Sequence, residues 1–91
     1  MDRRARAREL LLAAIEQVEA ELSSPRLALC PKQLCTCRAT LQEYLNALER
    51  DAMPPRRERD EGLCRLVLDE WPYGLPLGNA ILQAERAWRN A

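Results

Sequence analysis

The stretch LLLAAIEQVEAELSSP, residues 10–25, decides the fold class of this chain. Its apolar residues return at intervals of three and four positions, the spacing that places side chains on one face of an α-helix. The residues that mark this face are Leu11, Ile15, Val18 and Leu22. Pro25 ends the pattern, because proline has no N–H for the helical ladder and disfavours helical geometry in the residue before it. The sequence therefore predicts a first helix over residues 5–23.

Three further stretches repeat this periodicity and are separated by prolines. We expect helices over residues 31–52, 57–71 and 76–89. Pro31 and Pro76 suit the first turn of a helix, where a missing N–H is harmless. The second helix has an alternative start at Thr40, because Thr40 and Glu43 fit a capping box. The expected fold class is all-α: a compact bundle of about four helices joined by short proline-containing loops, in a single domain over residues 1–91.

The composition argues against several functional classes. Lys plus Arg and Asp plus Glu both number 14, so the formal net charge is zero, whereas general nucleic-acid binders usually carry a basic excess. The chain has no histidine, which removes the commonest general base and the imidazole metal ligands. It also lacks a glycine-rich phosphate-binding loop. We therefore expect a protein that is not an enzyme.

The apolar segments are too short for a membrane protein. The longest uninterrupted run extends from Leu10 to Ile15, well below the length that spans a bilayer. The chain begins rich in arginine, but Glu9 and Glu16 interrupt the pattern of a signal or transit peptide. We expect a cytoplasmic protein without membrane contacts, in a compartment where thiols stay reduced.

The segment CPKQLCTC, residues 30–37, raises the possibility of a metal site. The candidate ligands for zinc or an iron–sulfur cluster are Cys30, Cys35, Cys37 and Cys64. If the second helix begins at Pro31, Cys35 and Cys37 point to nearly opposite sides, at about 200° for two residues, and cannot bind one ion. If it begins at Thr40, the thiols can converge. We favour free thiols and no cofactor, with a zinc protein as the alternative and a disulfide from Cys64 to Cys35 or Cys37 as a further one.

A DNA-binding regulator is a second alternative. Residues 63–89 have the length of a helix-turn-helix, and the arginine-rich segment RRARAR, residues 3–8, could contact phosphates. The presumed recognition helix, however, opens with Leu77 and Gly78, and its arginines, Arg86 and Arg89, come late. Nucleic acid is therefore the less favoured partner.

Two features favour a protein–protein interaction module. Trp71 and Tyr73 lie in the proline-containing segment WPYGLPLG, residues 71–78, and these residue types are enriched at binding hot spots. The first helix carries more apolar residues than one face of a small bundle needs, an excess that usually meets another chain. We expect a homodimer or another protein partner, with an interface formed by Leu10, Leu11, Ile15, Val18 and Leu22 of the first helix together with Trp71 and Tyr73.

Overall fold

The computed structural model describes residues 2–59 and 61–91, and all of the regular structure in these residues is helical. The elements are α1 (Arg3–Ser23), α2 (Pro31–Glu49), the 3-10 turn η1 (Arg56–Glu58), α3 (Gly62–Glu70) and α4 (Pro76–Arg89). The all-α bundle predicted from the periodicity is confirmed. None of the helices in this described part combines the length and the apolar character that crossing a bilayer requires.

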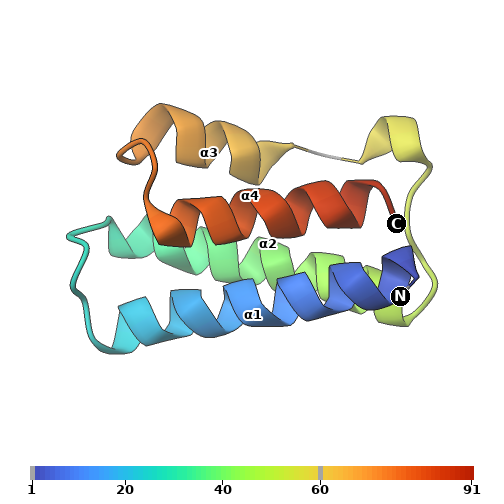
Figure 1. The fold of residues 1–91 in the computed structure, drawn as a ribbon, viewed down its shortest axis with the longest axis horizontal. Coiled ribbons are helices and arrows are strands. Elements are labelled where there is room, and N and C mark those ends of the chain that lie inside the picture. Colours follow the sequence, from blue (N-terminus) through green and yellow to red (C-terminus); the bar gives the residue numbers. More distant parts are fainter. Residues whose placement is uncertain (1, 60) are drawn as a thin grey trace.

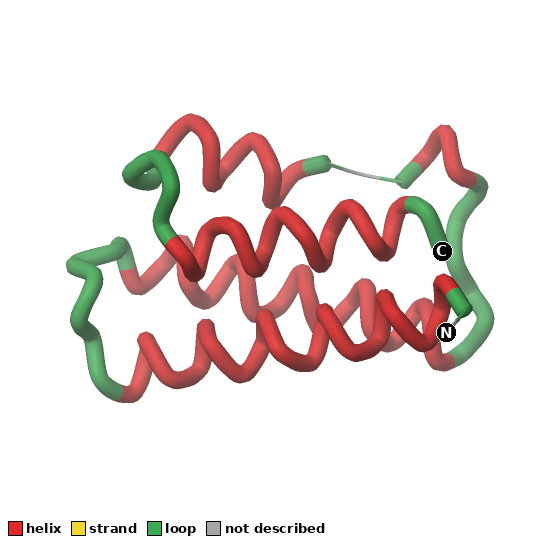
Figure 2. Tube along the Cα trace, in the orientation of Figure 1, coloured by secondary structure: helices red, strands yellow, loops and turns green. Residues whose placement is uncertain are grey.

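The four helices run alternately up and down (Figure 1). Helix α1 packs against both α2 and α4, and α3 packs against α4. The loops gather at the two ends of the bundle (Figure 2), and both chain ends lie at the same end (Figure 1). Short connections between antiparallel helices produce this arrangement. As a result, the loop between α3 and α4 is at the opposite end from the chain termini.

The breadth of the apolar surface on α1 is explained by packing on two sides. This helix contacts both α2 and α4, so its buried residues cover a wide sector rather than a single seam. The buried apolar residues of α1 are Ala7, Leu11, Ala14, Ile15 and Val18. The helix begins at Arg3, before the predicted residue 5, because the side chain of Asp2 caps it by accepting a hydrogen bond from the N–H of Ala5 at 2.9 Å.

The second helix begins at Pro31, not at the alternative start, Thr40. It ends at Glu49, and the predicted end at residue 52 is wrong. Asp51 adopts a left-handed conformation with φ of 54°, and the N–H of Ala52 donates back to the carbonyl of Ala47 at 2.9 Å. This arrangement is a Schellman motif, which closes the helix by satisfying its last carbonyl groups.

The third predicted helix, residues 57–71, is shorter than expected. Residues Arg56–Glu58 form the separate turn η1, and α3 covers only Gly62–Glu70. The N-terminus of α3 is capped from another helix: the carboxylate of Glu85 accepts hydrogen bonds from the N–H groups of Leu63 at 3.1 Å and Cys64 at 2.8 Å. The predicted start at residue 57 is therefore wrong, because the cap contributed from α4 leaves no local signal in the sequence. The fourth helix has the predicted bounds.

Aromatic side chains join α2 to α3 and α4. The rings of Tyr44 and Trp88 stack with their centroids 4.0 Å apart, and the hydroxyl of Tyr44 donates to Glu85 at 2.6 Å. The indole N–H of Trp71, directly after α3, donates to the side chain of Gln33 on α2 at 3.0 Å. The hydrogen bond of Trp71 fixes the end of α3 and the start of the α3–α4 loop, where the candidate site lies.

Candidate functional site

Two strongly exposed apolar side chains border one groove between α3 and α4. Across the described residues, the large hydrophobic side chains that are exposed are Leu12, Leu27, Leu68 and Tyr73. The last two are the most exposed, at 58% and 98%, and both line a groove of about 310 Å³. Its floor includes Val67, Trp71 and Gly78, and its sides include Leu75 and Leu82. We call this the apolar groove.

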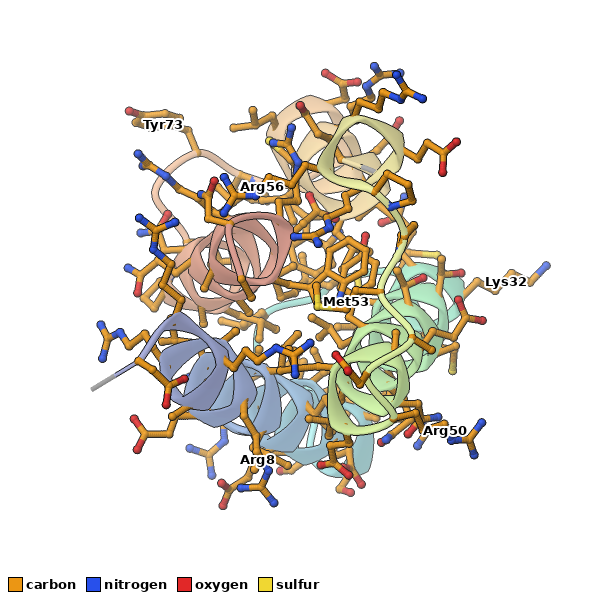
Figure 3. The ribbon with its side chains drawn as sticks, turned by 90° about the vertical axis from the view of Figure 1, so that its right-hand side faces the viewer. Arg8, Lys32, Arg50, Met53, Arg56 and Tyr73 are labelled. Atoms are coloured by element: carbon orange, nitrogen blue, oxygen red, sulfur yellow. The ribbon has the colours of Figure 1, made fainter. Side chains whose placement is uncertain are left out.

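The local sequence explains how the apolar groove forms. Trp71 ends α3 and is held by its hydrogen bond to Gln33, so the floor is fixed. Gly74 turns the chain with φ of 77°, a conformation that suits glycine, and Pro76 starts α4. Gly78 lets the helices approach, because a Cβ atom there would lie only 2.9 Å from Cγ1 of Val67. Tyr73, at the tip of the turn, projects away from the helices (Figure 3).

The predicted interface residues divide between this groove and the core. Trp71 is buried in the floor and Tyr73 is exposed on the rim. In α1, Leu11, Ile15 and Val18 are buried inside the chain's own core, and Leu10 and Leu22 are half-buried against it. The apolar excess of α1 is therefore covered by α2 and α4 of the same chain.

The outward face of α1 carries one exposed leucine. Leu12 is 39% exposed, and the exposed residues one turn to either side of it are Arg8, Glu9 and Glu16. Charged side chains therefore surround the exposed apolar residue on this face.

Leu68 and Leu82 belong to the groove but were not identified from the sequence. Leu68 is apolar although it lies off the buried stripe of α3, which contains Leu63 and Val67. The sequence could have indicated Leu68 as a binding residue, because it is an apolar residue outside the buried face of a short helix. Leu82 gave no such signal, because it follows Ile81 and is half-buried beside the core.

The cysteines do not form a common site. All four are free: Cys30 and Cys35 are exposed, Cys64 is half-buried and Cys37 is buried. Among residues 2–59 and 61–91, no three His, Cys, Asp or Glu side chains come together as metal ligands. The start of α2 at Pro31 also removes the loop that the metal alternative required. Burial, reinforced by the charge of Glu85, raises the pKa of the Cys37 thiol to about 11, so this thiol stays protonated at neutral pH.

A second hollow, of about 430 Å³, lies at the other end of α4. It is lined by three arginines, Arg3, Arg6 and Arg56, together with Ala87 and Asn90. Figure 3 looks onto this end of the bundle, where Arg56 is labelled, and the guanidinium of Arg56 donates to the carbonyl of Asn90 at 3.3 Å. We call it the basic hollow.

Two arginines of α1 that line the basic hollow lack the salt bridges that neighbouring arginines of this helix make. Arg4 pairs with Asp51 and Arg8 pairs with Glu49, whereas Arg3 and Arg6 make no salt bridge within the described residues. Burial, followed by the nearby charges of Arg56 and Arg4, lowers the pKa of Arg59 at this end. Positive charge is therefore concentrated here without full compensation.

The start of α4 is a poor candidate for reading bases. Leu77 and Gly78 are buried, and a recognition helix needs exposed polar residues in its first turn. Arg89 is already engaged by Glu61 at 2.7 Å.

The comparisons with known proteins assign no family: the chain matches no protein-family model and no curated protein.

Proposed function

We propose that this chain is a non-catalytic helical interaction module that binds a bulky apolar side chain of another protein in the apolar groove. The observation that carries the proposal is the convergence of Leu68 and Tyr73, the two most exposed large hydrophobic residues described, on one groove. Exposed apolar side chains that gather around a concave surface are typical of protein interaction sites. Tyr and Trp are also the residue types that dominate binding energy at such sites.

The size of the groove favours a segment of a partner over a second copy of this chain. A stable protein–protein interface buries about 1,600 Å² in total, whereas a groove of about 310 Å³ accommodates one or two side chains. On the outward face of α1, the exposed Leu12 is surrounded by Arg8, Glu9 and Glu16, so this face offers little apolar area for a dimer. The expected homodimer is therefore not the occupant we propose.

The chemistry of the polar residues supports a binding role over catalysis. The buried carboxylate of Glu85 is occupied as a helix cap, and the thiol of Cys37 is buried and protonated. The exposed free thiols of Cys30 and Cys35 suit a reducing compartment, and we propose the cytoplasm.

The test is a peptide-display selection against the full chain, with a library of 18-residue helix-forming peptides. The dissociation constant of the strongest peptide is then measured by fluorescence anisotropy. The variants Leu68→Ser and Tyr73→Ser change exposed side chains and keep the fold, so each is expected to weaken binding by about tenfold or more. The matched controls, Leu12→Ser and Leu27→Ser, remove exposed leucines elsewhere and are expected to change binding by less than about twofold.

Equal effects of all four substitutions, or a selection without any peptide that depends on Leu68 and Tyr73, would show that the apolar groove is not a docking site.

A further inference from the structure

The apolar groove and the basic hollow flank the exposed face of α4, the groove on the side toward α3 and the hollow on the side toward α1. Asn79 lines the first and Asn90 lines the second. These residues are eleven positions apart, which corresponds to about three turns, a rotation of only about 20° and a rise of about 16 Å. One short segment lying along α4 can therefore reach both sites.

The basic hollow needs a negatively charged occupant. Two of its three arginines come from α1 and one comes from η1. The rest of its lining, Ala87 and Asn90, comes from the end of α4 and carries no charge. Arg3 and Arg6 have no ion-pair partner in the described residues, and Arg56 lines the same hollow. Guanidinium groups bind carboxylates with paired hydrogen bonds, and such a partner would relieve the repulsion.

We propose that one amphipathic helical segment of a partner protein occupies both sites. Its bulky apolar residue enters the apolar groove, and its carboxylates, about ten or eleven residues away, pair with Arg3, Arg6 and Arg56. A separation of eleven residues returns a helix to nearly the same face, so a straight helix can present both groups together. This inference rests on the proposed function and adds the charge and the spacing of the partner.

A second copy of this chain fits this surface poorly. A two-fold axis parallel to α4 would place the two basic hollows against each other, and one perpendicular to α4 would place each basic hollow on an apolar groove. Both arrangements lack charge complementarity. Duplex DNA offers phosphates for the arginines but no bulky apolar group for Leu68 and Tyr73, so an acidic amphipathic helix matches the surface better.

The experiment is a double-mutant cycle with the strongest 18-residue peptide from the display selection. The double variant Arg3→Gln/Arg6→Gln is compared with Arg26→Gln/Arg38→Gln, which removes the same charge from exposed arginines elsewhere. In the peptide, the acidic residues ten or eleven positions from the apolar anchor are replaced by Gln. We expect the protein change and the peptide change each to weaken binding by about tenfold, and the two together by little more than either alone. The control pair is expected to change binding by less than about threefold.

Each outcome separates this inference from the proposed function. If Leu68→Ser and Tyr73→Ser abolish binding but the cycle shows no coupling, the groove is a docking site and the spanning segment is wrong. If Leu68→Ser and Tyr73→Ser have no effect, the proposed function itself fails. A labelled 20-base-pair duplex that binds through Arg3 and Arg6, without coupling to peptide carboxylates, would replace the acidic helix by nucleic acid.

Discussion

The carboxylate of Glu85 receives hydrogen bonds from three donors on two other helices: the hydroxyl of Tyr44 and the N–H groups of Leu63 and Cys64. Its side chain is 1% exposed, so it has no access to water that could replace them. A negative charge at the N-terminus of α3 is also favoured by the helix dipole. Glu85 therefore attaches α3 to the rest of the bundle.

The substitution Glu85→Gln tests this role. Gln keeps the shape, but its NH2 group must face a donor, and the charge at the start of α3 is lost. We expect the free energy of unfolding to fall by about 2 kcal/mol, measured by urea denaturation. The control, Glu16→Gln, changes an exposed carboxylate and should shift stability by less than about 0.5 kcal/mol. Equal effects at both positions would contradict the capping role.

The buried thiol of Cys37 makes the free energy of unfolding depend on pH in the alkaline range. Burial raises its pKa from 9.0 to about 11, so the folded chain retains the proton when the unfolded chain has lost it. The contribution of this thiol is fully present below pH 9 and declines as the pH rises to about 11, by up to about 3 kcal/mol. The measurement is urea denaturation at pH 8, 9, 10 and 11, in comparison with Cys37→Ala. A Cys37→Ala chain that loses stability as steeply as the wild type would refute the effect.

At the scale of elements, the loop between α1 and α2 contains a residue in an unfavourable conformation. Ala28 has φ of 55°, in the left-handed region that disfavours a Cβ atom. The loop is held in place by Glu21, whose carboxylate accepts hydrogen bonds from the N–H groups of Arg26 and Leu27. The loop anchored by Glu21 therefore contains a conformation that alanine does not prefer.

The substitution Ala28→Gly is expected to stabilise the chain by about 0.5–1 kcal/mol, because glycine adopts this conformation without strain. The same change at Ala13, an exposed residue inside α1, is expected to destabilise it by about 1 kcal/mol. Thermal unfolding of both variants gives the comparison. Shifts of the same sign would be inconsistent with this explanation.

Element boundaries show where local sequence signals suffice. Pro31 and Pro76 begin helices as predicted, because proline acts on the backbone of its own residue and its neighbours. Two predicted ends were wrong for different reasons. The end of α2 is set locally by the left-handed Asp51, a conformation that no glycine marks in the sequence. The start of α3 is set by Glu85 from α4, and a cap from a distant segment leaves no pattern in the helix that it caps.

At the scale of the whole molecule, Gly78 sets the distance between α3 and α4. A Cβ atom at this position would lie 2.9 Å from Cγ1 of Val67, so Gly78→Ala must displace either the Val67 side chain or the helices. We expect a loss of about 1–3 kcal/mol of stability and weaker binding of the selected peptide. Gly74→Ala meets no atom within 4 Å and costs only its backbone strain at φ of 77°. It should destabilise by about 1 kcal/mol, less than Gly78→Ala, which calorimetry can check.

The candidate site was predictable only in part. Trp71 and Tyr73 were identified because aromatic residues in a proline-containing segment are conspicuous in any sequence. The contribution of Leu68, and the meeting of Arg3 and Arg6 with Arg56, depend on how α1, η1, α3 and α4 pack. Periodicity identifies the apolar face of each helix, but it does not say which neighbour covers that face.

Helical periodicity and proline geometry act over a few residues, so the helices of the described residues and two of their starts, Pro31 and Pro76, are predictable from the sequence. Which apolar surface stays open depends instead on how the helices pack. Two helices pack on α1 and bury Leu11, Ile15 and Val18, whereas α3 meets α4 at Gly78 and leaves Leu68 and Tyr73 exposed. The reason is physical: burial depends on contacts between segments far apart in the chain, and no local pattern contains them.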